Sequence, residues 1–366
     1  MTIDRQYRIM AVLDELRADW AVLSSPDAVC YSTGQPIPIE TGPSPFTGGP
    51  ALAFVGRQGG AGLVCSNVEG SGVGIEAEVY SGFSGNVTNQ IANYRASVQK
   101  LASRLGVGGR LAVQMASHPA QLSDLLPGPF MAIDRLLDRA RAIKTPSEIA
   151  ALRRVGKITA DAQIATRNLS RAGSSEVELL NAIRAVIEQA AGGRCPLAGE
   201  YLGGIDNTAT LGTPPGVRQL KAGDPVICDL APRINGYWGD SCASFVIGSP
   251  SDEWLRLFAR ARETLSLAQS LIRPGLRVSE LDAKLRAHMS GAGYSYPHHS
   301  GHGIGTSVHE WPRLVPNEDA MIEENMVLMV EPGSYLPDIG GVRTEYMLRV
   351  TATGTENLTD FPLGPL

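Results

Sequence analysis

The sequence predicts an α/β (α+β) protein with two domains, the second of which contains an internal repeat. At 366 residues the chain is longer than most single domains. Apolar strand-like runs alternate with helical patterns up to about residue 140. Between residues 145 and 350 the order helix, helix, hairpin occurs twice, about 105 residues apart. We therefore predict domains at residues 1–142 and 143–366, and we expect the second to have pseudo-twofold symmetry. Coincidental spacing is the alternative to a duplication.

Composition excludes several classes of protein. Hydrophobic residues make up 43% of the chain and charged residues 19%, which is ordinary for a globular protein. The net charge of −5 provides no basic surface, so we expect neither nucleic acid nor a membrane as a partner. The amino terminus has no signal-peptide pattern, and no apolar run reaches membrane-spanning length. The five cysteines form no CxxC pair, which suits a reducing compartment, so we expect a cytoplasmic protein.

The first domain is predicted from short elements. Ile9, Leu13, Leu16 and Trp20 recur at helical spacing, which predicts an amphipathic helix at the start of the chain. Further patterns predict strands over 21–24, 51–55, 61–65, 111–114 and 130–133, and helices over 94–105 and 121–125.

The second domain opens with a strong helix signal. Thr145 can cap the helix, Pro146 suits its first turn, and Glu148 completes a capping box. We expect this helix to run to about residue 169. Similar helix starts predict helices from Ser175 to about 190, from Ser251 to about 272 and from Ser279. A later hairpin is also predicted, with strands near 326–331 and 342–350 joined across Gly340-Gly341.

An earlier hairpin carries two aspartates on one face. The Asn235-Gly236 pair favours a type I′ turn, and this register places Asp240 opposite Ala231. Asp229 lies two residues from Ala231, so both aspartates project from the same face, about 7–8 Å apart along the diagonal. Two such carboxylates repel each other unless a cation lies between them. The hairpin therefore indicates a metal site, with a solvated hairpin as the alternative.

Other residues extend this candidate site. Glu331 and Glu345 occupy the corresponding positions of the second hairpin, so two facing halves would bring four carboxylates together. Cys228 and Cys242 flank the aspartates and could be soft metal ligands, although core packing is the favoured role for both.

Four of the six histidines lie between residues 298 and 309, among glycines that allow close backbone approach. Carboxylates with at least one imidazole suit paired Mn²⁺, Co²⁺, Zn²⁺ or Fe²⁺ rather than a thiolate zinc site. Such a metal pair lowers the pKa of bound water and supports hydrolysis. The four histidines are His298, His299, His302 and His309.

These motifs resemble the pita-bread metallopeptidases, which include aminopeptidase P, prolidase and methionine aminopeptidase. The resemblance covers the whole chain, including a creatinase-like amino-terminal domain, which methionine aminopeptidase lacks. It implies a creatinase-like α/β domain over residues 1–142 followed by a pita-bread catalytic domain. The matching metal ligands are Asp229, Asp240, His302 in SGHGIG, Glu331 in VEPGSY and Glu345 in GGVRTE, with HExP at His309–Pro312.

The resemblance implies a hydrolase that cleaves the amide bond next to proline in dipeptides or short peptides. It further implies two divalent metal ions per chain, with Mn²⁺ preferred and Co²⁺, Zn²⁺ or Fe²⁺ also open. A metal-bridging hydroxide would be the nucleophile, and Glu331 would be both ligand and proton shuttle.

Other residues match non-ligand positions of the family. His298 and His309 would contact the substrate and the tetrahedral intermediate. Arg343 would orient carboxylates and, with Tyr335, face the substrate, although packing is an equal alternative for Tyr335. His299 has no counterpart, and we interpret it as structural or solvated.

The sequence departs from the family pattern near the substrate. Gly212 stands where the family's N-S-A-x-P-H motif has its histidine, and Cys242 lies in an altered run after Asp240. Glu345 is followed by Tyr346 instead of an aspartate. All five ligands are retained. The departures favour, as an alternative, a small-molecule C–N hydrolase or lyase acting on a modified amino acid, similar to ectoine hydrolase. A non-catalytic binding protein is a remote alternative.

The resemblance also implies a homodimer in which one amino-terminal domain reaches the partner's site. The segment from Pro36 to Pro50 is a Pro/Gly-rich loop too long for a simple connector. This loop is the natural candidate to reach across, and a plain surface loop is the alternative.

Overall fold

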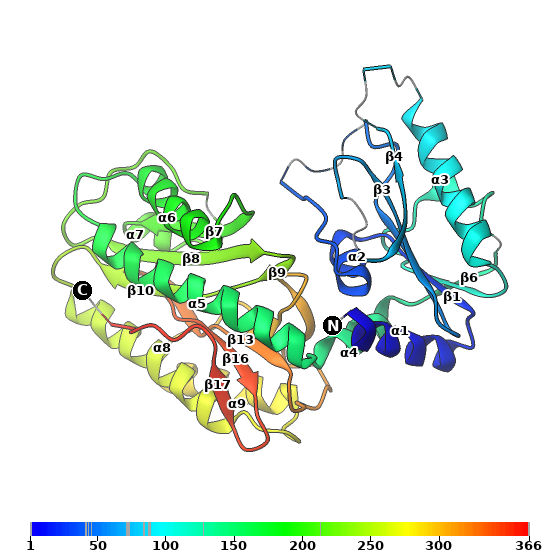
Figure 1. Ribbon diagram of the computed structural model, residues 1–366. Helices are drawn as coiled ribbons and strands as arrows, with labels where there is room; N and C mark the ends of the chain where they lie inside the picture. The colour runs from blue at the N-terminus through cyan, green and yellow to red at the C-terminus, as the bar shows by residue number, and fades with distance from the viewer. Residues whose placement is uncertain are drawn as a thin grey trace. The chain divides into compact units, whose positions relative to one another are not determined.

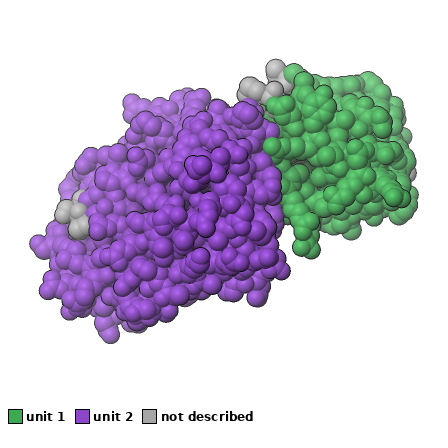
Figure 2. Space-filling model, turned by 90° about the horizontal axis from the view of Figure 1, so that it is seen from below, with its two compact units in different colours: residues 1–141 green, residues 142–366 purple. Residues whose placement is uncertain are grey.

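The computed structural model describes residues 2–40, 42, 44, 46–70, 74–82, 85–86, 89–126, 128–212 and 214–364. The chain separates into two compact units, Met1–Arg141 and Ala142–Leu366, which Figures 1 and 2 show. Residues 41, 43 and 45 of the predicted long loop lie outside the described residues. Among the helices that the structure describes, none is long and apolar enough to span a membrane.

The first unit is a six-stranded mixed sheet with helices on both faces. Ala21 and Leu23 of β1 pack with α1, α2 and α4, whereas Val22 packs with α3, because successive side chains of a strand alternate between faces. The strand order is β4-β3-β2-β1-β5-β6. The elements are α1 Thr2–Leu16, β1 Trp20–Leu23, α2 Pro26–Thr33, β2 Leu52–Gly56, β3 Ala61–Ser66, β4 Glu76–Tyr80, α3 Gln90–Leu105, β5 Leu111–Val113, β6 Phe130–Ala132 and α4 Asp134–Ala142.

Three details of this unit differ from prediction. Trp20 begins β1 instead of continuing the first helix, because Arg17 adopts a left-handed φ of 52° and ends α1. The helix predicted over 121–125 is a short 3₁₀ turn, Ala120–Leu122. The elements α2, β4 and α4 were not predicted, although Ser25 and Pro26 provide α2 with an N-cap and an initial proline.

The second unit contains the four predicted long helices. They are α5 Pro146–Leu169, α6 Glu176–Ala191, α8 Asp252–Leu271 and α9 Val278–Ser290. Both predicted capping boxes form, at Thr145 with Glu148 and at Ser175 with Glu178. The start of α9 is different, since Arg277 and not Ser279 occupies the N-cap.

The first hairpin has the predicted register. Strand β8 (Pro225–Ile234) continues through the turn into β9 (Tyr237–Trp238) and β10 (Cys242–Val246). Asn235 and Gly236 have φ of 51° and 86°, as a type I′ turn requires. Cys242 pairs with Asp229. On its other edge β8 pairs with β7 (Leu197–Gly203), which was not predicted.

The second hairpin consists of two successive pairs of strands. Strand β13 (Val327–Val330) pairs with β16 (Tyr346–Val350), and β14 (Gly333–Leu336) pairs with β15 (Gly340–Arg343). The turn lies at residues 337–339, so the prediction of a turn at Gly340-Gly341 is wrong. These glycines lie in β15, where a side chain on Gly341 would overlap the carbonyl of Thr208 in α7 (Ile205–Thr208). The remaining strands are β11 Gly301–Gly303, β12 Glu310–Leu314 and β17 Thr355–Asn357.

The two hairpins meet directly. The backbone nitrogen of Glu345 donates to the carbonyl oxygen of Cys242 at 2.9 Å, which forms a bridge between the halves of the repeat. Helix α5 packs on β8, while α8 packs on β15 and α9 on β12. In Figure 1 these helices lie outside the strands. The acidic positions of both hairpins are therefore brought to one centre.

Candidate metal centre

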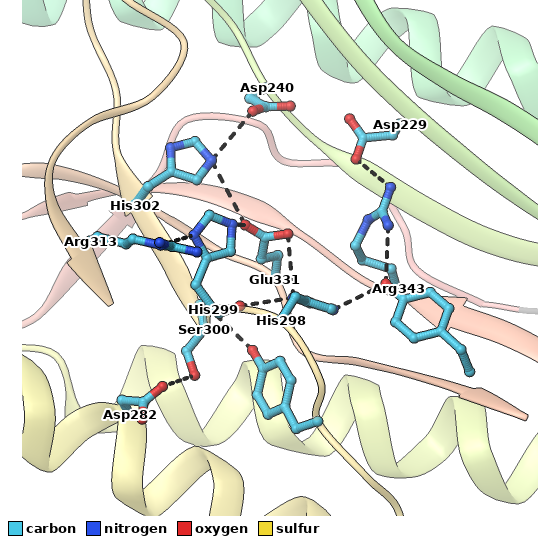
Figure 3. Close-up of polar contacts among 12 residues, drawn as sticks. Asp229, Asp240, Asp282, His298, His299, Ser300, His302, Arg313, Glu331 and Arg343 are labelled. Carbon is cyan, nitrogen blue, oxygen red and sulfur yellow. Dashed lines mark hydrogen bonds and ion pairs between the residues drawn. The ribbon is translucent and has the colours of Figure 1, made fainter. Parts of the chain in front are cut away.

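The carboxylates and one histidine converge from four different segments. Asp240 follows β9, Glu331 follows β13, Glu345 lies between β15 and β16, and His302 lies on β11. All four residues are buried. His302 Nε2 lies 3.7 Å from Asp240 Oδ2 and 3.8 Å from Glu331 Oε1, as Figure 3 shows. The predicted pairing of the two halves therefore brings an imidazole between carboxylates of both.

Two overlapping groups of side chains have the geometry of metal ligands. Asp240, His302 and Glu345 each offer one donor atom within 4.8 Å of the others, and so do His299, His302 and Glu331. The Oε2 atom of Glu345 is buried and has no hydrogen-bond partner among the described residues. A buried carboxylate oxygen without a partner is costly, and a divalent cation would satisfy it. These oxygen and nitrogen donors fit a divalent metal.

Charge repulsion within this centre supports the same conclusion. Burial, together with the charges of nearby carboxylates, raises the pKa of Asp240 and of Glu345 well above the usual range. The pKa of Asp229 is also raised by burial, although Arg343 opposes the rise. A bound cation would remove this repulsion and return the carboxyls to their ionised form.

His302 is prepared for metal ligation. Burial lowers the pKa of His302 to about 4, so its ring is neutral at physiological pH. Its Nδ1–H donates to the carbonyl oxygen of Gly303 at 2.8 Å. This bond fixes the tautomer and leaves the lone pair of Nε2 directed at Asp240 and Glu331.

Arg343 connects the carboxylates to the predicted substrate side of the site. Its Nη2 lies 2.8 Å from Asp229 Oδ2, and its Nη1 donates to the Tyr335 hydroxyl at 3.0 Å. That hydroxyl lies 3.0 Å from His298 Nε2, while His298 Nδ1–H donates to the carbonyl of His299 at 2.8 Å. The Tyr335 hydroxyl therefore donates to His298, and the polar chain runs from Asp229 to the histidine loop.

His309 lies at the edge of the centre. It is exposed, and its ring centroid lies 4.4 Å from that of His302 in an edge-to-face arrangement. The next residue, Glu310, forms a buried ion pair with Lys144 at 2.7 Å and accepts the backbone N–H of Ser307 at 3.1 Å. These contacts fix the segment that carries His309.

Two residues of the centre were missed or misjudged from sequence. His299 Nε2 lies 3.0 Å from Glu331 Oε1, so the solvated alternative for His299 is wrong, whereas its structural alternative is not tested by this contact. Glu200 lies directly opposite Asp229 in the pairing of β7 with β8, and its Oε2 is 3.5 Å from Arg343 Nη2. The signal for Glu200 would have been the strand β7, whose pairing places it beside Asp229.

The cysteines and Gly212 occupy the surroundings of the centre. Cys228 and Cys242 are buried, and neither belongs to a group of potential metal ligands among the described residues. Cys242 packs with Leu202, Ile227 and Tyr335, which agrees with the favoured packing role. Gly212 has a φ of 74°, and a Cβ built on it meets no heavy atom within 4 Å.

Comparison with known proteins identifies the family. Metallopeptidase family M24 matches residues 150–352, more than half of the chain, and the chain belongs to this family. The Xaa-Pro dipeptidase of Pyrococcus furiosus is 29% identical over 267 residues, which cover 72% of this chain and 75% of that protein. The protein named putative dipeptidase YkvY, from Bacillus subtilis, is 33% identical over 237 residues. The match covers 64% of this chain and 64% of YkvY, so this chain spans slightly less than two thirds of the length of YkvY.

Solved structures share the complete fold. The Xaa-Pro dipeptidase from Bacillus anthracis superposes with a TM-score of 0.83 at 24% identity, covering 100% of both chains. The prolidase from Pyrococcus horikoshii has a TM-score of 0.81 at 21% identity, covering 98% of this chain and 99% of its own. The predicted fold class and the resemblance to pita-bread metallopeptidases are therefore confirmed.

Proposed function

We propose that this protein is a dinuclear metal-dependent hydrolase of the Xaa-Pro peptidase type. It would cleave the amide bond next to proline in dipeptides or short peptides. The observation that carries this proposal is the group of potential ligands formed by Asp240, His302 and Glu345, together with the buried, unpartnered Oε2 of Glu345. The relatives named as Xaa-Pro dipeptidases support this substrate class.

The metals would be held by residues of both hairpins. Two divalent ions are expected, with Mn²⁺ preferred and Co²⁺, Zn²⁺ or Fe²⁺ also suited to oxygen and imidazole donors. When bound, such ions polarise the scissile carbonyl and lower the pKa of water. The ligands would be Asp229, Asp240, His302, Glu331 and Glu345.

The remaining chemistry belongs to side chains around the ligands. Glu331 would take a proton from the attacking water and pass it to the leaving nitrogen. His298, Tyr335 and Arg343 form one hydrogen-bonded chain, which supports a shared role in orienting the substrate. His309 would contact the tetrahedral intermediate from the exposed side of the centre.

A second candidate is a small-molecule hydrolase or lyase that breaks a C–N bond in a modified amino acid. The open space at Gly212 favours it, since no imidazole is present where the family has one. Intact ligand groups argue against the third alternative, a non-catalytic binding protein.

The experiment is to measure metal content and turnover in the same preparation. The purified protein is loaded with Mn²⁺ or Co²⁺ and given Xaa-Pro dipeptides, longer Xaa-Pro-Xaa peptides and peptides without proline. We expect two metals per chain and hydrolysis of the proline peptides. Two bound metals without peptide turnover would favour the small-molecule candidate, whereas absence of metal binding would contradict the whole proposal.

A homodimer in the cytoplasm is also proposed, with the segment Pro36–Pro50 reaching the partner's site. Sedimentation of the full chain tests the dimer. Shortening the loop should change the selectivity between dipeptides and longer peptides while metal content stays constant.

A further inference from the structure

His299 lies between a guanidinium group and a candidate metal ligand. On one side, Arg313 Nε donates to His299 Nδ1 at 3.1 Å. On the other side, His299 Nε2 lies 3.0 Å from Glu331 Oε1. Figure 3 shows the ring between these two partners, with the ring of His302 beside it. The contact with Glu331 also makes His299 a geometric candidate for a metal ligand.

The contact with Arg313 decides which nitrogen of His299 carries the proton. A guanidinium group has only donors, so Nδ1 must present its lone pair to Arg313. A neutral imidazole has one donor nitrogen and one acceptor nitrogen. The proton therefore lies on Nε2, which is the atom that faces Glu331. In this tautomer Nε2 donates a hydrogen bond and has no lone pair for a metal.

The neighbouring histidines have the opposite tautomer. His302 and His298 each use Nδ1–H to donate to a backbone carbonyl at 2.8 Å. Their Nε2 atoms therefore present lone pairs, in His302 toward the carboxylates and in His298 toward the Tyr335 hydroxyl. The rings of His299 and His302 are stacked with centroids 5.4 Å apart, and both direct Nε2 at Glu331 Oε1, the first with a proton and the second with a lone pair.

We propose that His299 is a positioning residue of the metal centre and not a ligand. Its Nε2–H donates to Glu331 Oε1 and fixes the orientation of that carboxylate, while Arg313 holds the ring in this tautomer. The effect on catalysis rests on the proposed role of Glu331 as the proton-transfer group. The tautomer and the absence of metal ligation do not depend on that role.

The first experiment determines the tautomer without metal or substrate. In metal-free protein labelled with ¹⁵N-histidine, the nitrogen shifts distinguish protonated from unprotonated ring nitrogens. The signals that disappear in His299→Gln belong to His299. We expect them to show a protonated Nε2 and an unprotonated Nδ1, whereas His302 shows the reverse. A protonated Nδ1 in His299 would overturn the proposal.

The second experiment counts imidazole ligands. Pulsed EPR of the Mn²⁺-loaded protein detects the ¹⁴N nuclei of coordinated histidine. The coupling should be the same in wild type and in His299→Gln, whereas His302→Gln should remove it. A weaker coupling in His299→Gln would show that His299 is a ligand.

The third experiment separates positioning from a purely structural role. His299→Leu should lower kcat on a proline dipeptide about tenfold, the size expected for losing a hydrogen bond to a charged group, with KM changed less than about twofold. His299→Gln retains an N–H donor and should recover kcat to within about threefold of wild type. The matched control is His288→Leu. His288 lies on α9, outside the centre, and contacts Arg260 of α8, so its removal should leave kcat unchanged.

The outcomes distinguish this inference from the proposed function. An unchanged kcat in His299→Leu, with active wild type, would overturn the positioning role. If wild type binds Mn²⁺ but cleaves no peptide, the proposed function fails, while the nitrogen shifts and the EPR coupling still decide the assignment of His299.

Discussion

Arg343 and Asp229 form an ion pair of 2.8 Å although they belong to opposite halves of the repeat. The arginine is buried, and it also lies 3.5 Å from Glu200 and donates to Tyr335. One guanidinium group therefore pairs with a candidate ligand and also contacts Glu200 and Tyr335. With Oδ2 of Asp229 held by Arg343, Oδ1 is the oxygen of this carboxylate that a metal ion would take.

The contribution of this pair can be measured by removing the arginine. Arg343→Met would leave the carboxylates of Asp229 and Glu200 beside each other in the metal centre without the guanidinium group that pairs with both. We expect the free energy of unfolding of the metal-free protein to fall by about 3 kcal/mol, the cost typical of breaking a buried pair. Chemical denaturation provides the value. Arg153→Met, which removes an exposed arginine paired with Glu356 at 2.6 Å, is the control and should cost less than about 1 kcal/mol. Equal effects of both substitutions would contradict a buried role for Arg343.

Asp240 should be essential for metal binding. Asp240→Ala removes a donor from the group formed with His302 and Glu345, so we expect loss of at least one metal ion and of activity together. Elemental analysis after gel filtration measures the metal. Asp161→Ala changes an exposed aspartate of α5 that pairs with Lys157, and it should retain the full metal content. Unchanged metal in Asp240→Ala would refute the assignment of this ligand.

Metal uptake should release protons and strengthen as pH rises. The pKa values of Asp240 and Glu345 are raised in the metal-free centre, by burial first and then by neighbouring carboxylates. Their protonated forms are therefore favoured by folding, and the metal-free protein loses stability as pH rises through the raised pKa values. A divalent ion displaces these protons, so its apparent affinity increases with pH.

Calorimetric titration of Mn²⁺ in two buffers with different ionisation heats counts the released protons. Asp240→Asn should release fewer protons per bound metal ion than wild type, since it lacks one of the carboxyl groups with a raised pKa. An affinity that is the same at about pH 6 and about pH 8, without proton release, would rule out this linkage.

Gly212→His tests whether the missing imidazole limits peptidase activity. A Cβ built at this position meets no heavy atom within 4 Å, so the substitution introduces no clash at Cβ. We expect kcat/KM on Xaa-Pro peptides to rise. Because the backbone φ is 74°, the substitution should also cost about 1 kcal/mol of stability. Gly212→Ala has the same backbone cost without an imidazole and is the matched control. A rate that is equal or lower in Gly212→His would mean that the pocket has changed elsewhere too.

Local rules were sufficient for much of the second unit. The capping boxes at Thr145 and Ser175 and the turn at Asn235-Gly236 depend on residues within four positions of one another. The register of β8 with β10 follows from that turn, which is why the approach of Asp229 and Asp240 was predictable. The facing of the two hairpins followed from the duplicated order of the elements.

Features that depend on distant segments were not predictable in the same way. The strand β7 carries Gly199, Gly203 and Glu200, a composition that gives little strand signal, and it is stabilised by pairing with β8. Gly340 and Gly341 suggested a turn, but close contact with α7 and not chain reversal accounts for Gly341. The role of His299 depends on Arg313, which follows it by fourteen residues and joins it only after β11 and β12 pair.

The bridge between Cys242 and Glu345 has a consequence for the order of events during synthesis. The candidate ligands are spread from Asp229 to Glu345, and the backbone of the last one is anchored to the strand that follows the first two. A nascent chain that has exposed only the first hairpin presents two aspartates and no imidazole of the centre. The full set of candidate ligands therefore exists only after residue 345 has been synthesised, and a shorter nascent chain offers a metal ion fewer donors.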